Sequence, residues 1–157
     1  MKKLSRNLTL ICVLVMIITL FLPYASATER WWGEEAQRDM SMAEFLIYFL
    51  GDNSGWSDMY IPVMVVMGTM GLFLLLMLLF VLIKKPIPII VFDVLLAGVF
   101  MLHNWIYTKT RIIGYGYEFS IAYYLFFALI VLTLAGAIWM IVARAVNKLV
   151  QAGNEVA

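Results

Sequence analysis

The chain has 157 residues, of which 64% are hydrophobic and only 13% are charged, and its formal net charge is +1. Soluble domains contain roughly 45–50% apolar and about 25% charged residues, so this composition excludes an ordinary soluble domain and favours one embedded in lipid. The near-neutral charge, without a clustered basic face, also excludes a nucleic-acid-binding protein. We therefore expect a single transmembrane domain over residues 1–157 whose surroundings are the lipid bilayer.

Four apolar runs in the sequence predict four transmembrane helices. We place these spans at residues 7–24, 61–83, 87–107 and 119–142, with a long connection over 25–60. Each run is close to the ~20 residues that a helix needs to cross about 30 Å of hydrocarbon. The predicted fold is an all-α, integral membrane four-helix bundle, and its short loops favour a bacterial inner (plasma) membrane.

Basic residues flank the runs on alternate sides and predict their orientation. They lie before the first run, between the second and third, and after the fourth: Lys2, Lys3, Arg6, Lys84, Lys85, Arg144 and Lys148. Because cytoplasmic segments carry the excess of Lys and Arg, both termini are expected in the cytoplasm, an N-in/C-in topology. The mostly acidic connection over 25–60 then lies outside, and Lys109 and Arg111 in the second outer loop are a mild exception.

The first run also has the anatomy of a secretory signal peptide. Its basic start and apolar core are followed by the helix-breaking Pro23 and by an Ala-Ser-Ala triplet at 25–27, which fits a cleavage site. A retained helix is favoured because the run reaches membrane length when it is extended back to Leu4. Cys12, the only cysteine, excludes an intramolecular disulfide and is expected to pack as a small apolar residue.

The connection over 25–60 is predicted to contain a short amphipathic helix. Ser41 and Glu44 have the spacing of a capping box, and the apolar stretch that follows them ends at Gly51. Such a helix is too short to span a bilayer and too apolar for water, so we expect it on the outer membrane surface or over the outer mouth of the bundle. The candidate outer-interface residues, as headgroup anchors or as partner contacts, are Trp31, Trp32, Phe45, Tyr48, Phe49 and His103.

The third run carries an acidic residue, Asp93, about 9 Å along the helix from its start. An unpaired carboxylate there costs on the order of 2–3 kcal/mol, so it is expected to be protonated, paired or facing water. Helical spacing adds Asn104 to the same face, and Arg144 is the candidate partner, with Lys84 or Lys85 as alternatives. The roles that remain open for Asp93 are a structural ion pair or hydrogen bond, an ion or proton site, and a contact with another subunit.

Metal or cofactor binding is not expected. His103 is the only histidine and has no second ligand nearby in the sequence, so hydrogen bonding at the interface is favoured over a pH-sensitive or metal-binding role. The methionines of the second run are better explained by packing than by binding of a soft metal. These are Met64, Met67, Met70 and Met77.

The scarcity of convergent polar groups also argues against an enzyme. The sequence favours a non-catalytic small polytopic membrane protein: an accessory, assembly or regulatory subunit that acts through helix packing and its outer loop. Its expected partner is another membrane protein or a second copy of the chain. The alternative is an oligomeric transporter or channel subunit in which Asp93 is an intramembrane ion or proton site.

The predicted topology, with a long first and a short second outer loop, resembles that of claudin-type and other tetraspan proteins. Those families use paired cysteines in the loops, whereas this chain has only Cys12 inside the first run. The resemblance is therefore confined to the topology, and shared topology alone implies no function.

Overall fold

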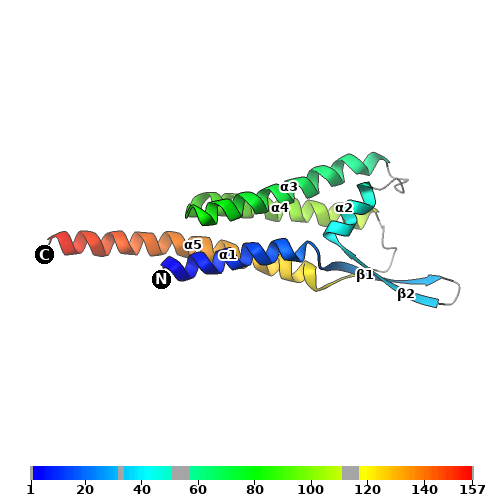
Figure 1. The fold of residues 1–157 in the computed structure, drawn as a ribbon, viewed down its shortest axis with the longest axis horizontal. Helices are drawn as coiled ribbons and strands as arrows, with labels where there is room; N and C mark the ends of the chain where they lie inside the picture. Colours follow the sequence, from blue (N-terminus) through cyan, green and yellow to red (C-terminus); the bar gives the residue numbers. More distant parts are fainter. Residues whose placement is uncertain (1, 32–33, 51–56, 111–116, 157) are drawn as a thin grey trace.

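The computed structural model describes residues 2–31, 34–50, 57–110 and 117–156 (Figure 1). Within these ranges the chain is mostly helical, as predicted. Its elements in chain order are α1 (Lys2–Thr19), β1 (Pro23–Trp31), β2 (Glu34–Ser41), α2 (Met42–Leu50), α3 (Ser57–Leu82), α4 (Pro86–Thr110), β3 (Tyr117–Phe119) and α5 (Ile121–Val156).

Helices α1, α3, α4 and α5 lie side by side as a bundle (Figure 1). The helix α1 packs against α5 and α3 packs against α4, while contacts between α4 and α5 and between α1 and α3 join the two pairs. The start of α1 and the α3–α4 turn lie at one end, and α5 continues past it toward the C-terminus. We call this the terminal end, and the opposite end, where the strands and α2 lie, the sheet end.

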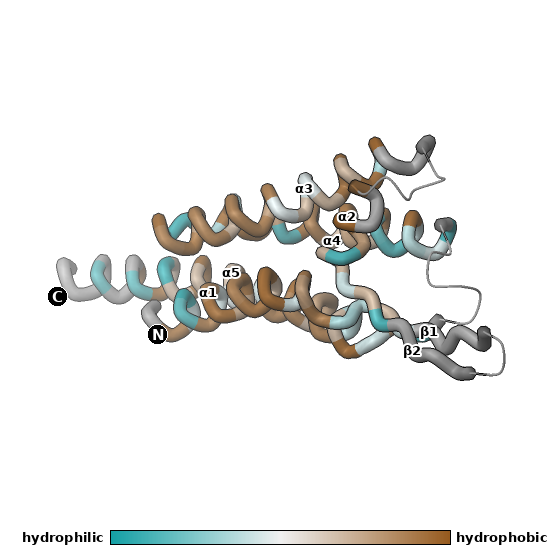
Figure 2. Tube along the Cα trace, turned by 45° about the vertical axis from the view of Figure 1, so that its right-hand side comes forward, coloured by the Kyte–Doolittle hydropathy of each residue, from teal (hydrophilic) through white to brown (hydrophobic). Residues whose placement is uncertain are grey.

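Three of the bundle helices are long and apolar enough to cross a membrane. Their candidate spans are Ile61–Leu82, Pro86–Lys109 and Ile121–Asn147, with 22, 24 and 27 residues. At a rise of about 1.5 Å per residue, even the shortest covers roughly 33 Å. Hydrophobic residues follow these helices along most of their length (Figure 2). The apolar part of α1, Leu4–Thr19, is shorter.

The helix α1 ends at Thr19, earlier than the predicted end of the first span at residue 24. Three i→i−3 hydrogen bonds tighten the chain beyond it: the backbone N–H groups of Leu20, Phe21 and Leu22 donate to the carbonyls of Ile17, Ile18 and Thr19, at 3.3, 3.0 and 3.2 Å. A tight turn of this kind often closes a helix. Pro23 then begins β1, because its ring lacks the N–H that a helix would need and fits the edge of a strand.

The prediction of an all-α chain overlooked a small antiparallel sheet with the strand order β2-β1-β3. Strand β1 pairs with β2 from Pro23↔Ser41 to Trp31↔Glu34, and its first part also pairs with β3. The sequence of β2 is rich in Glu, Ala, Gln and Asp, which are depleted in strands, so local propensity does not predict this strand. Pairing with β1 is what holds β2 extended.

The short helix α2 begins directly after β2. The backbone N–H of Ser41 donates to Glu44 Oε2 at 2.7 Å, and the N–H of Glu44 donates to Ser41 Oγ at 3.1 Å. These are the two reciprocal hydrogen bonds of a capping box. The N–H of Ala43 also donates to the carbonyl of Leu20 at 3.0 Å, which ties the start of α2 to the end of α1.

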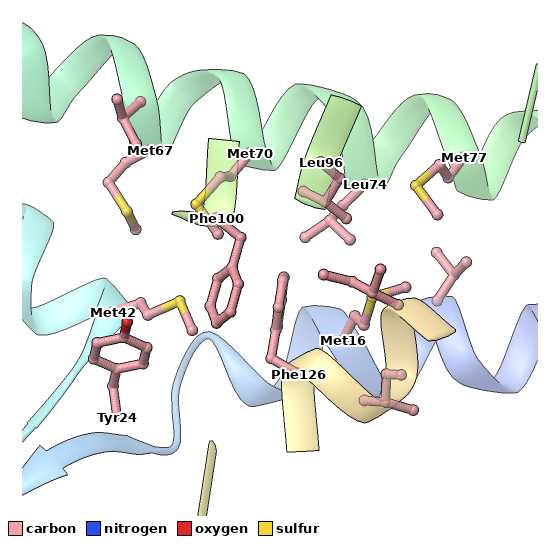
Figure 3. Close-up of a cluster of buried hydrophobic side chains, with 14 of the residues drawn as sticks. Met16, Tyr24, Met42, Met67, Met70, Leu74, Met77, Leu96, Phe100 and Phe126 are labelled. Atoms are coloured by element: carbon pink, nitrogen blue, oxygen red, sulfur yellow. The ribbon is translucent and has the colours of Figure 1, made fainter. Parts of the chain in front are cut away.

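The core of the bundle is filled by methionine, leucine and aromatic side chains that converge from all four long helices (Figure 3). The figure labels Met16, Tyr24, Met42, Met67, Met70, Leu74, Met77, Leu96, Phe100 and Phe126. Flexible methionine side chains fill irregular gaps between helices. The burial of Met67, Met70 and Met77 therefore agrees with a packing role for the methionines of α3.

Candidate functional site

Helix α4 presents one continuous buried face to the core. Its members are spaced three or four residues apart: Ile89, Asp93, Leu96, Phe100, His103 and Tyr107. Two of them, Asp93 and His103, are ionisable side chains with exposed fractions of only 1%. Ten residues of helix separate these two by about 15 Å, so they belong to two different sites.

The first site is a cluster of rings near the sheet end. Its residues come from β1, α2, α4, β3 and α5, and we call it the aromatic node: Tyr24, Phe45, Phe100, His103, Tyr107, Phe119 and Tyr123. Such ring pairs stabilise a core beyond the apolar area they bury. The node therefore joins the sheet and α2 to the bundle.

Tyr24 is the centre of the aromatic node. Its fully buried ring stacks on the imidazole of His103 at a centroid distance of 5.1 Å. It also meets the edges of Tyr107 at 5.1 Å and Phe119 at 5.7 Å. Its hydroxyl donates to Asn104 Oδ1 at 3.4 Å, which is a long hydrogen bond. In the sequence, Tyr24 is marked only as the last residue of the predicted first span, and the adjacent Pro23 is the signal that the chain changes direction there.

His103, which the sequence predicts at the outer interface, is buried inside the protein with an exposed fraction of 1%. It is packed between Tyr24 and Phe45, with a centroid distance of 5.3 Å to Phe45, and no described residue forms a hydrogen bond with its Nε2. Phe45, on α2, also contacts Tyr107 at 4.9 Å and is 1% exposed. The structure thus brings two of the predicted outer-interface residues, Phe45 and His103, together in the node.

The other predicted outer-interface residues are placed only in part. Trp31 is the last residue of β1, and Tyr48 and Phe49 lie in α2, but the structure describes their backbone alone. Trp32 lies outside the described residues. Their roles at the interface stay predictions.

The second site surrounds Asp93 in the other half of the bundle. Gly136 of α5 lies against Thr9 of α1, so one turn further along each helix Thr133 comes opposite Cys12. Phe100 of α4 stacks on Phe126 of α5 at a centroid distance of 4.8 Å, so two turns further along these antiparallel helices Asp93 comes to the level of Thr133. The exposed fractions of Cys12, Asp93 and Thr133 are 3%, 1% and 0%. We call these three side chains the polar layer, since they come from three helices at one level of the core.

The polar layer is poor in hydrogen bonds. Among the residues that the structure describes, none forms a hydrogen bond of normal geometry with either carboxylate oxygen of Asp93 or with Thr133 Oγ1. Buried polar groups are nearly always paired, so each exception calls for an explanation.

The other members of the predicted polar face lie elsewhere. The guanidinium of Arg144 donates from Nη2 to the carbonyl oxygen of Lys84 at the terminal end, so it caps the α3–α4 turn instead of pairing with Asp93. Asn104 is half-buried and accepts from Tyr24 near the sheet end. The structure therefore separates Asp93 from both residues and surrounds it with Cys12 and Thr133. No sequence pattern marked those two as its neighbours.

Close packing of α1 on α5 positions the polar layer. A Cβ atom added at Gly136 would lie 2.5 Å from Thr9 Oγ1, so only glycine fits this contact. The Thr9 hydroxyl donates to the carbonyl of Ser5 at 2.9 Å, which satisfies it within its own helix. One turn further along each helix, the same close approach places Cys12 opposite Thr133.

Neither site has the ligand set of a metal centre in the described part of the chain, where no three His, Cys, Asp or Glu side chains converge. The ring contacts of the aromatic node can hold the sheet and α2 rigidly on the bundle, and they enclose one imidazole. The polar layer has the chemistry of a proton or hydrogen-bond site, since it combines a carboxyl, a thiol and a hydroxyl. Comparisons with family models, with curated proteins and with solved structures find no match to this chain.

Proposed function

We propose that this chain is a non-catalytic membrane protein that acts as an accessory, assembly or regulatory subunit. All four bundle helices cross the bilayer of a bacterial inner membrane, with both termini in the cytoplasm. The sheet and α2 then lie on the outer side, where they bind another membrane protein or a second copy of the chain.

The distribution of basic residues supports this topology. The start of α1, with Arg6, and the α3–α4 turn, with Lys84 and Lys85, lie together at the terminal end (Figure 1). Positive charge gathered at one end of a bundle is typical of its cytoplasmic side. Reporter fusions after residues 1, 85 and 157 test the topology, and we expect all three to report a cytoplasmic position. An outer position for any of them contradicts it.

The observation that carries the proposed interaction role is the fixed attachment of a projecting hairpin. Strands β1 and β2 extend past the ends of the bundle helices (Figure 1), while the base of β1 is held inside the bundle by Tyr24. The side chains of Ser26 and Ser120 form a hydrogen bond of 2.8 Å, and the N–H of Ser120 donates to the carbonyl of Tyr24 at 2.9 Å. A preorganised surface of this kind lowers the entropic cost of binding a partner.

Shortening the hairpin tests this proposal. Ala27 pairs with Arg38, so residues 28–37 can be replaced by an Asn-Gly turn that keeps the base of the sheet in register. The full chain and the shortened chain are purified in mild detergent, and the mass and composition of each complex are measured. We expect a stoichiometric partner, or a dimer, with the full chain only.

The control for this experiment is a measurement of thermal stability, because a shortened chain that fails to fold would also lose its partner. Thermal unfolding of the shortened chain should match that of the full chain, since the aromatic node is retained. A full chain that is monomeric and partner-free, or a shortened chain that keeps the same partner, contradicts the proposal.

Transport is the second candidate function, and the burial of Asp93 without a hydrogen-bond partner among the described residues is the observation that favours it. Carboxyl groups in membrane helices commonly mark ion or proton paths. Ion or proton flux into proteoliposomes, lost in Asp93→Asn, would support a transporter or channel subunit. Equal flux with and without the protein would exclude it for the ions tested.

A further inference from the structure

We propose that the polar layer is an intramembrane proton-binding site, in which Asp93 holds the proton and Cys12 and Thr133 are the polar side chains beside it. The proposal uses the membrane placement proposed above, but it does not depend on the partner-binding role of the hairpin. Asp93 is the buried carboxyl group of the bundle to which the described residues donate no hydrogen bond, and the proposal assigns it a proton as its ligand.

Among the residues that the structure describes, none places a positive charge against Asp93. On α1, the side chain that approaches it is Cys12, and on α5 it is Thr133 at the same level. On α3, the stretch Ile61–Leu82 contains no Asp, Glu, Lys, Arg or His, and its buried side chains are methionine, leucine and valine. An ionised carboxylate would therefore be buried without a counter-ion from these helices, whereas a neutral carboxylic acid needs none.

The basic residues toward the terminal end are engaged or remote. Arg6 lies six residues before Cys12 on α1, which is about 9 Å along the helix axis. Arg144 is held at the α3–α4 turn by its hydrogen bond to the carbonyl of Lys84, and both Lys84 and Lys85 are exposed there. Asp93 lies seven residues beyond the first residue of α4, which is about 10 Å along the helix axis. The carboxyl group is thus separated from the terminal end by about two turns of helix.

A proton suits this site better than a metal cation. Hard cations such as Ca²⁺ take six to eight oxygen ligands, while the polar layer offers one carboxyl, one hydroxyl and a soft thiol. A proton needs no coordination shell and no cavity. The neutral acid can donate its hydrogen to the Thr133 hydroxyl or the Cys12 sulfur, and after the proton leaves, both neighbours can donate to the carboxylate. When Asp93 ionises, its O–H bond breaks and the proton passes to water, and the reverse transfer restores the acid.

Infrared spectroscopy of the protein in lipid vesicles tests this proposal directly. A protonated carboxyl group gives a carbonyl stretch that is separate from the carboxylate bands. Because Cys12 is the only cysteine, the protein also has a single S–H stretch, which falls in frequency when the thiol donates a stronger hydrogen bond. The two bands therefore report the proton of Asp93 and the response of its neighbour in one measurement.

At pH 7 we expect a protonated-carboxyl band in the wild-type protein and in the control variant Asp39→Asn, which alters an exposed aspartate of β2. The band should be missing in Asp93→Asn. When the pH is raised, the wild-type band should disappear reversibly while the S–H band moves to lower frequency. In Asp93→Asn, the S–H band should not move until the thiol itself ionises.

A second measurement covers the case in which Asp93→Asn does not fold. Labelling of the aspartate carboxyl groups with ¹³C shifts the band in the wild-type protein and so assigns it to aspartate without any substitution. Absence of an aspartate band at pH 7 overturns the proposal, as does loss of the band at constant pH when Na⁺ or Li⁺ is added, which would assign the site to a cation. If the frequency of the S–H stretch stays the same when Asp93 gains or loses its proton, the role of Cys12 is overturned.

Discussion

The two halves of the bundle are built in different ways. Near the sheet end, large rings from five elements meet around Tyr24, and backbone and serine hydrogen bonds fasten the sheet to α1 and α5. Toward the terminal end, α1 and α5 approach closely through small side chains, with Gly136 against Thr9, and the polar layer lies one turn away. Each half buries polar groups, but only the sheet end surrounds them with ring contacts from several directions.

The two halves therefore have different roles: one attaches the sheet and α2 to the bundle, and the other positions the polar layer. The aromatic node couples separate segments, so damage to it should release the sheet and α2 from the bundle. The close α1–α5 contact determines where Cys12 and Thr133 stand relative to Asp93, so damage to it should disturb the polar layer. Substitutions in either half can separate these two roles.

The largest effect is expected for Tyr24→Ala. Removing this fully buried ring leaves a cavity beside Phe100, His103 and Tyr107, and such truncations cost about 3–5 kcal/mol. Tyr24→Phe keeps the ring and removes the hydroxyl with its long hydrogen bond to Asn104, and it should cost about 1 kcal/mol. Denaturant titration in detergent measures both values. An equal loss of unfolding free energy in the two variants would show that the hydroxyl, rather than the ring, provides the stability.

A loss of about 1–3 kcal/mol is expected for Gly136→Ala, because its new Cβ would overlap Thr9 Oγ1. The matched control is Gly68→Ala on α3, where a Cβ meets nothing within 4 Å. The control should be neutral or gain up to about 1 kcal/mol from higher helix propensity. Adding Thr9→Ala to Gly136→Ala should restore part of the stability. Independent, additive effects of these two substitutions would contradict the proposed contact.

At the sheet end, Ser41→Ala should cost about 1 kcal/mol, because it removes the hydroxyl that caps α2. Hydrogen exchange should show the loss as faster exchange of the α2 backbone amides, while the amides of α4 and α5 stay protected. Uniformly faster exchange in every helix would mean that α2 does not open separately from the bundle.

At the terminal end, Lys84→Gly should stabilise the protein by about 1 kcal/mol, since non-glycine residues are strained in the left-handed region. Lys84 has a φ of 61° in the turn that closes α3, where the N–H of Lys85 donates to the carbonyl of Phe80 at 2.9 Å. Lys85→Gly removes the same charge without relieving a positive φ, and it is the matched control. A higher unfolding temperature for Lys84→Gly alone is the expected result.

The smallest effect is expected from pH at Glu44. The backbone N–H of Ser41, and then its hydroxyl, hold the pKa of this carboxyl below its ordinary value of 4.5. A lowered pKa in the folded state means that the stabilising contribution is complete above pH 4.5 and is lost as the pH falls through the lowered value. The difference in unfolding temperature between wild type and Glu44→Ala should therefore shrink on acidification. A difference that grows at low pH would contradict this sign.

Part of each site could be read from the sequence. An aspartate inside an apolar run is conspicuous, and its burial follows from the physics of the bilayer. Its neighbours could not be read, because the Cys12 and Thr133 side chains look like ordinary small residues until α1 and α5 are packed together. The pairing of Asp93 with Arg144 was reasonable from topology, but the guanidinium reaches the carbonyl of Lys84 instead.

The sheet shows the same limit for the fold. Helix periodicity and apolar length predict the long helices, since each of these is a property of one segment. The strand β2 has a polar sequence with poor strand propensity, and it is extended only because β1 offers a ladder of backbone partners. On the other side of β1 lies β3, which follows β1 by more than eighty residues and which no local pattern anticipates.

What the sequence by itself determined is the kind of molecule: apolar helices of membrane length, basic residues gathered at one end, and a capped short helix after Ser41. These features follow from local composition, spacing and charge. Only the tertiary structure decided that Tyr24 joins the sheet to the bundle, that His103 is enclosed by rings, and that Asp93 shares its level with Cys12 and Thr133. The physical reason is that these contacts join residues from different elements, and packing alone chooses which side chains meet.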